Sequence, residues 1–132
     1  MTSYFAANGL NALEVKADLS KSARYKSRAM IEHDYFSHDN PQDGNVSFGG
    51  LMRNVFGYNH YSGFGENLAA QYGSRSATAE NFFLQWKNSD GHNKNMLDPN
   101  WKYMGLGVAY TSEAGPTFKN YPATLATQHF AR

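Results

Sequence analysis

The chain has 132 residues, the size of one domain with a substantial core, and 41% of them are hydrophobic against 17% charged. A disordered tail or a coiled coil would carry far more charge. The formal net charge is +1 without a basic stripe, which argues against a nucleic-acid partner. Cysteine is absent, so disulfides, thiolate zinc sites and thiol nucleophiles are excluded.

The N-terminus has neither the basic region nor the apolar core of a signal peptide. No apolar run reaches the roughly 20 residues of a membrane span, so no transmembrane segment is predicted. We expect either an intracellular protein or a chain that begins inside a longer precursor. Residues before Gly9 are expected to form the last turn of a helix, and residues 10–15 are ambiguous.

The first long helix is predicted over residues 19–34, with Asp18 as its N-cap. One face is expected to be buried and carries Leu19, Ala23, Met30 and Ile31. The rest of the helix is expected to face solvent and carries Lys21, Arg24, Lys26, Arg28 and Glu32.

The middle of the chain alternates turns with short elements. Residues 40–45 predict a loop, residues 48–57 a short helix, and residues 66–70 an extended segment. After a polar link at 74–78, a second strong helix is predicted over 79–88. Its buried side is expected to carry Phe82, Phe83 and Trp86.

Two strands are predicted near the C-terminus. Residues 103–110 alternate large side chains with glycine and alanine, and residues 121–130 alternate after a turn region at 113–120. Helices that come mostly first and strands that come mostly last predict an α+β fold with an antiparallel sheet.

The stretch 85–97 joins an aromatic helix end to Ser89, Asp90 and Gly91. We predict a tight turn here, because glycine accepts a positive φ that other residues resist. The turn would aim His92, a residue type suited to proton transfer or metal ligation near neutral pH. A second turn is predicted at 95–100.

His38, Glu66 and His92 each lie next to a predicted turn, where functional side chains tend to be presented. Two imidazoles and a carboxylate form the ligand set of an open zinc site. They could equally form an acid/base set in which Glu66 orients a histidine. The simpler alternative is that each side chain only caps or hydrogen-bonds its own neighbourhood.

The other polar candidates are weaker. Ser37 and Ser89 lie near histidines, but no Gly-x-Ser-x-Gly elbow supports a serine nucleophile, and Ser89 is expected to satisfy backbone groups at a helix end. His33 is expected on the surface, His60 in a loop that could line a cleft, and His129 facing away from Gln128. No dinucleotide or phosphate-loop motif is present, so no organic cofactor is predicted.

Six motifs in order resemble the CAP superfamily (cysteine-rich secretory proteins, antigen 5 and pathogenesis-related 1), in its bacterial SCP-like branch. They fall in the opening residues 8–23 and in the segments 35–38, 65–69, 86–97, 104–108 and 127–130. The resemblance covers nearly the whole chain as one domain, residues 1–132, with a truncated N-terminal helix.

The resemblance implies a three-layer α-β-α sandwich with a small antiparallel sheet. It also implies a cleft of two histidines and two acids that can hold a divalent metal, most readily zinc. His38, Glu66 and His92 fall on three of those positions, and Ser89 stands near the fourth, which removes one carboxylate. Most members are secreted or attached to the cell surface, so an extracellular, bacterial protein is expected.

We therefore expect a secreted or cell-surface module that binds a small-molecule, lipid or protein ligand through a cleft of His38, Glu66 and His92. Asn67, Ser89 and Gln128 are expected to support that cleft by hydrogen bonds. One alternative is a metal-dependent hydrolase of peptides or cell-wall material that uses the same cleft. The other is a lipid- or sterol-binding protein with an aromatic groove near Phe48, Phe56, Tyr58, Tyr61 and Phe64.

Overall fold

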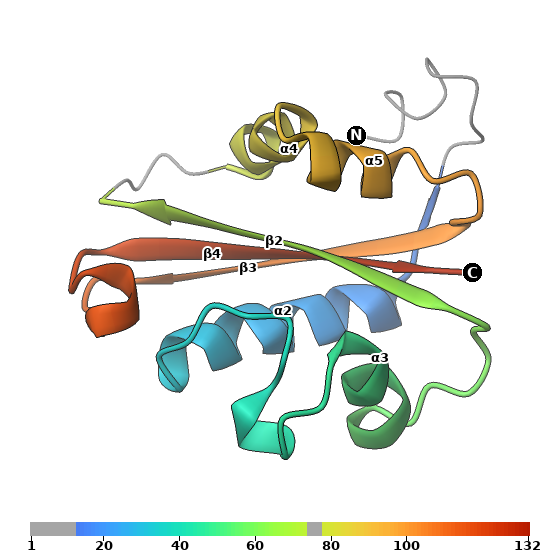
Figure 1. The fold of residues 1–132 in the computed structure, drawn as a ribbon, viewed down its shortest axis with the longest axis horizontal. Helices are drawn as coiled ribbons and strands as arrows, with labels where there is room; N and C mark the ends of the chain where they lie inside the picture. The colour runs from blue at the N-terminus through green and yellow to red at the C-terminus, as the bar shows by residue number, and fades with distance from the viewer. Residues whose placement is uncertain (1–12, 74–77) are drawn as a thin grey trace.

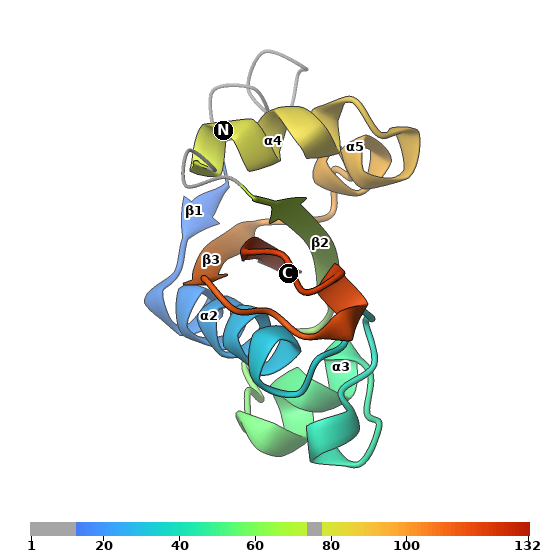
Figure 2. The same cartoon turned by 90° about the vertical axis from the view of Figure 1, so that its left-hand side faces the viewer.

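The computed structural model describes residues 13–73 and 78–132 and has the α-β-α sandwich architecture (Figure 1). A four-stranded sheet lies between helices α2 and α3 on one face and helices α4 and α5 on the other, as the turned view also shows (Figure 2). Predictions for residues 1–12 and 74–77 lie outside the described residues. Within the described ranges, every helix is too short or too polar to cross a membrane.

The sheet is built from β1 (Glu14–Val15), β2 (Phe64–Tyr72), β3 (Tyr103–Thr111) and β4 (Ala123–Ala131), in the order β1-β3-β4-β2. Strand β4 pairs antiparallel with both β2 and β3, as predicted, whereas the short β1 pairs parallel with β3. All residues of β4 are buried, because this strand has neighbours on both edges and helices on both faces.

Helix α2 (Ala17–Glu32) begins earlier than predicted, with Lys16 at the N-cap position. The prediction that Asp18 is the N-cap is therefore wrong. The Asp18 carboxylate lies in the first turn and accepts hydrogen bonds from the Leu19 N–H at 2.7 Å and the Tyr61 hydroxyl at 2.8 Å. Asp18 thus ties the start of α2 to a distant loop, and this tertiary contact replaces the local cap.

Two glycines let α2 lie close against β3. A Cβ on Gly105 would collide with the backbone of α2 at Leu19, and one on Gly107 would collide with it at Arg24. A hydrogen bond also joins the helix to the strand, since the Ser27 hydroxyl donates to the Gly107 carbonyl at 2.9 Å. The glycines of β3 therefore set the distance between the first helix and the sheet.

The opposite face is covered by α4 (Ala79–Lys87) and α5 (Asp90–Met96). Phe82 and Trp86 are fully buried, as predicted, whereas Phe83 is only partly buried. The Trp86 indole N–H donates to the Leu68 carbonyl at 3.0 Å, which joins α4 to β2.

Helix α5 corrects the predicted turn at 89–91. Ser89 takes an extended N-cap conformation, Asp90 opens the helix, and Gly91 lies within it without a positive φ. Serine and aspartate are as favourable at the start of a helix as in a turn. The chain therefore stops one helix and starts the next at Ser89.

The connection from α2 to β2 contains a 3-10 turn (η1, Pro41–Asp43), the short helix α3 (Phe48–Gly50) and a π-helical turn (η2, Leu51–Val55). The predicted loop and short helix are confirmed. Gly57, near the predicted end of that helix, has a φ of 68°.

Candidate functional site

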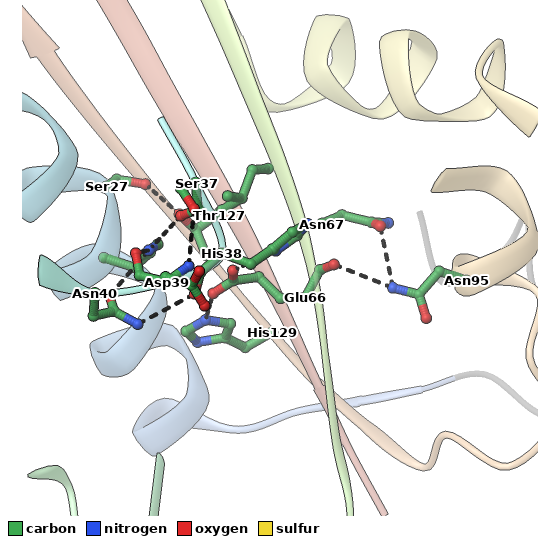
Figure 3. Close-up of polar contacts among 12 residues, drawn as sticks. Ser27, Ser37, His38, Asp39, Asn40, Glu66, Asn67, Asn95, Thr127 and His129 are labelled. Atoms are coloured by element: carbon green, nitrogen blue, oxygen red, sulfur yellow. Dashed lines mark hydrogen bonds and ion pairs between the residues drawn. The ribbon is translucent and has the colours of Figure 1, made fainter. Parts of the chain in front are cut away.

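Glu66 is the centre of a polar cluster that spans the sheet and the loop after α2 (Figure 3). Its Oε1 lies 2.8 Å from His38 Nδ1, and its Oε2 lies 2.7 Å from His129 Nε2. Glu66 and His129 are register partners on β2 and β4. The side chains of Glu66 and His129 are fully buried, whereas that of His38 is 52% exposed. The cluster therefore presents an outer imidazole supported by an inner carboxylate.

The electrostatics fix which atoms donate. Burial raises the pKa of Glu66, but hydrogen bonds from His129 and His38 and the charges of His129 and Lys26 outweigh it, so the pKa is lowered. An ionised carboxylate only accepts, so His38 donates through Nδ1 and His129 through Nε2. In neutral His38 the lone pair is then on Nε2, which hydrogen-bonds to no described residue. A carboxylate that orients an imidazole in this way prepares it for proton transfer or metal ligation.

The loop that carries His38 is held by a buried lysine. Lys26 Nζ donates to the Ser37 carbonyl at 2.7 Å, the Asp39 carbonyl at 3.2 Å and Asn40 Oδ1 at 2.9 Å. The expectation that Lys26 faces solvent is therefore wrong, because these oxygens satisfy its ammonium inside the protein. Burial lowers the pKa of Lys26 to about 8, against the opposing charge of Glu66.

His92 reaches the region from the other layer, in the first turn of α5. Its Nδ1 lies 2.8 Å from the Ser89 hydroxyl. Burial, and then the charge of His38, lower the pKa of His92, so the two imidazoles interact electrostatically. His92 makes no hydrogen bond to Glu66 or to His38.

Side-chain amides connect the two layers. The Asn67 amide donates to Gln128 Oε1 at 3.2 Å and to the His92 carbonyl at 3.3 Å. The Asn95 amide donates to the Asn67 side chain at 3.1 Å and to the Glu66 carbonyl at 3.3 Å. The three predicted supporting residues therefore divide. Asn67 hydrogen-bonds to Gln128 within the sheet and to the α5 backbone at His92, whereas Ser89 contacts the His92 ring.

The donor atoms limit how a metal could be held. In the described part of the chain, no group of three or more His, Cys, Asp or Glu side chains is arranged to hold a metal ion. Both oxygens of Glu66 are engaged by histidines, so Glu66 here orients His38. The Nε2 atoms of His38 and His92 make no hydrogen bond with a described residue. Two imidazole nitrogens are one protein ligand fewer than is usual for catalytic zinc.

His129 and Asn95 are the members that the sequence reasoning missed. His129 was expected to face away from Gln128, and it does, since Gln128 contacts Asn67 while His129 contacts Glu66. The signal that could have found His129 is strand pairing. Aligning the predicted strand around Glu66 with the last strand can place the two side chains opposite each other.

The serine and aromatic candidates have local roles. Ser37 Oγ accepts from the Asp39 N–H at 3.1 Å, as in a turn. Ser89 contacts His92, but no carboxylate of the described chain hydrogen-bonds to that imidazole, as a catalytic triad would require. The Tyr58 ring packs at 5.5 Å from Phe56 and at 6.2 Å from Tyr61. Ring-on-ring packing of this kind is what a structural cluster shows.

A family model described as the cysteine-rich secretory protein family, CAP, matches residues 4–121. Two proteins of Bacillus subtilis (strain 168) are similar in sequence. The uncharacterized protein YkwD is 40% identical over 99 residues, which cover 75% of this chain and 35% of YkwD. The uncharacterized membrane protein YlbC is 32% identical over 101 residues, which cover 76% of this chain and 27% of YlbC. The chain thus corresponds to about a third or less of each relative.

Solved structures agree with these matches. An extracellular SCP-domain protein of Bacillus anthracis superposes with a TM-score of 0.73 at 27% identity, over 99% of this chain and 37% of that chain. An outer surface protein of Borrelia burgdorferi has a TM-score of 0.67 at 15% identity, over 99% and 85%, and shares the fold alone. The family match, these relatives and the α-β-α sandwich together confirm that this chain belongs to the cysteine-rich secretory protein (CAP) family.

Proposed function

We propose that this domain is an extracellular ligand-binding module whose cleft presents His38, supported by Glu66 and flanked by His92. One observation carries the proposal: the buried Glu66 carboxylate lies 2.8 Å from the Nδ1 of a half-exposed imidazole. Burying a carboxylate is costly unless it is well paired, and here part of the pairing is made with a side chain that faces solvent. The extracellular placement is supported by the name of the Bacillus anthracis relative.

We further propose that a divalent metal, most readily zinc, is one ligand of this cleft. His38 and His92 would hold it through Nε2, while Glu66 would fix the His38 ring from behind. When bound, such an ion lowers the pKa of coordinated water and polarises a carbonyl group. Ser89 would set the orientation of the His92 ring.

Calorimetric titration of zinc into metal-free protein tests this proposal, with His38→Ala, His92→Ala and His33→Ala compared with the parent. His33 is an exposed histidine at the end of α2 and serves as the matched control. We expect binding by the parent and the control and its loss in both cleft variants. Binding by either cleft variant as tight as the parent's would contradict a shared site.

The geometry favours a hydrolase as the second candidate. A buried carboxylate behind an exposed imidazole is the arrangement of a general base, and His38 could take a proton through Nε2. This candidate predicts turnover of a peptide or cell-wall substrate that His38→Ala abolishes. Turnover that survives His38→Ala would exclude it.

A further inference from the structure

The solvent side of α2 borders a hollow of about 360 Å³ that the cleft does not include. Three basic residues line it, Lys21, Arg24 and Arg28, together with Glu32 and the ring of Phe56. The basic residues are spaced three and four apart, so they lie along one face of the helix. The opposite face of α2 carries Ser22, which contacts His129 beneath the sheet. The hollow is therefore separate from the Glu66 cluster.

The three cations are exposed, and none forms an ion pair or hydrogen bond with any residue that the structure describes. Two other cations do have partners, since Lys16 pairs with Glu14 and Lys26 is hydrogen-bonded to the loop after α2. Glu32 follows Arg28 by one helical turn, in the less favourable order for a helical ion pair, and forms none. The positive charge at this hollow is thus largely uncompensated from within the described chain.

The hollow also has an aromatic wall. The rings of Phe56 and Tyr25 meet edge to face at 5.2 Å, and the Tyr25 hydroxyl donates to Asp43 at 2.6 Å. The lining of the hollow carries three positive side chains and one carboxylate, whereas the whole chain has a net charge of only +1. A concave wall of low dielectric constant beneath a mainly positive cluster concentrates the field and attracts anions.

We propose that this hollow on α2 binds a phosphate group. Two guanidinium groups and an ammonium match the tetrahedral, multiply charged oxygens of phosphate, because guanidinium donates in a two-pronged geometry. The volume exceeds that of a bare phosphate and leaves room for an organic substituent against Phe56. A second hollow of about 420 Å³ shares Arg28 and Glu32 and continues toward Tyr110, so a longer phosphodiester could follow the helix.

The phosphate could belong to a soluble molecule or to a lipid headgroup, and two binding measurements separate these sources. The first is calorimetric titration with glycerol 3-phosphate. The second is co-sedimentation with phosphatidylcholine vesicles that contain or lack phosphatidylglycerol. Each uses the parent, Arg24→Gln/Arg28→Gln, and the control Lys94→Gln/Lys102→Gln. The control changes the net charge equally, at exposed lysines outside the hollow.

We expect the parent to bind in at least one arm, and Arg24→Gln/Arg28→Gln to weaken that binding about tenfold or more, because charge-assisted hydrogen bonds are lost. The control is expected to change it by no more than about twofold, since distant exposed charges are screened by salt. Binding in the first arm identifies a soluble source, and binding only to vesicles with phosphatidylglycerol identifies a headgroup.

Absence of binding in both arms, or equal weakening in the control, overturns the proposal. Both variants should keep the parent's melting temperature, because all four positions are exposed and Gln is a good helix former at the three helical ones. Should the double variant unfold, Lys21→Gln alone provides the same comparison. His92→Ala is expected to leave phosphate binding unchanged, so failure of the cleft proposal and of this one are distinguishable.

Discussion

At the residue scale, Glu66 joins two layers of the molecule through a single carboxylate. Glu66→Gln replaces one accepting oxygen by a donor, so one of His38 and His129 must lose its hydrogen bond or change tautomer to accept one. We expect the free energy of unfolding to fall by about 1–3 kcal/mol, the usual cost of leaving a buried polar group unpaired. Urea unfolding measures it, with the exposed Glu32→Gln as control. An equal effect of both substitutions would contradict the central role of Glu66.

Lys26 gives the stability of the protein a distinctive dependence on pH. Its pKa falls from 10.5 in the unfolded chain to about 8 in the folded one, so between these values the unfolded state binds more protons. Stability should therefore rise with pH in this window, by on the order of 2 kcal/mol between about pH 8 and 10. Above that the trend reverses, because burial raises the pKa of Tyr35 to about 12 and the folded state then holds the extra proton.

Urea unfolding of the parent and of Lys26→Met at several pH values tests this. Methionine fills a similar volume but does not titrate, so the rise should be absent in the variant. The variant should also be less stable near pH 7, because the Ser37 and Asp39 carbonyls and the Asn40 side-chain oxygen lose their donor. A parent and a variant with parallel pH profiles would show that another group is responsible.

The cluster also shows what a sequence can reveal at this scale. His38 and Glu66 could be chosen as candidates because each stands beside a turn and carries a suitable side chain. His129 could not be chosen in the same way, since one histidine in an alternating strand looks like any inward residue. The pairing partner decides its role, and pairing between residues 63 apart is a property of the sheet. The burial of Lys26 was not predictable for a related reason, because the carbonyls around it come from a loop that folds back onto α2.

At the element scale, the contact between α2 and β3 depends on the missing side chains of Gly105 and Gly107. Gly107→Ala would place a Cβ into the backbone of α2, which cannot move aside without leaving the sheet. We expect the free energy of unfolding to fall by about 3 kcal/mol or more, at the upper end of the range for overpacked sites. Thermal and urea unfolding measure the change.

Gly91→Ala is the matched control, because a Cβ there meets no atom within 4 Å and the residue is helical. We expect a gain of roughly 0.5–1 kcal/mol, since alanine is the better helix former. A loss of stability at Gly91 would instead favour the turn that the sequence suggests.

The elements themselves were largely predictable. The period of hydrophobic residues located α2, α4, β3 and β4, because each buries a continuous face, whereas β2 was expected only as an extended segment at 66–70. The start of α5 was not predictable, since Ser, Asp and Gly fit both a turn and a helix start. Packing of Met96 into the core beneath α5 favours the helix.

At the scale of the whole molecule, the sheet separates two of the three hydrophobic clusters of the described chain. Met30 and Leu125 belong to one, and Phe82 and Ala126 to the other. We expect Met30→Ala and Phe82→Ala each to lower the free energy of unfolding by about 2–5 kcal/mol. The two losses should add in the double variant, because the sheet keeps the sites apart. Circular dichroism and tryptophan fluorescence should still report one coincident transition, since β4 contributes to both clusters. Two separated transitions would show that the layers unfold independently.

The order of the sheet has a consequence for how the protein is made. Strand β4 lies between β2 and β3 in the sheet, pairs with both, and is the last of the four strands to be synthesised. A nascent chain therefore cannot close its sheet while residues 123–131 are still inside the ribosome. Until then Glu66 lacks His129, and the apolar faces of α2 and α4 have only part of their docking surface. This domain therefore stays open until its last strand has been synthesised.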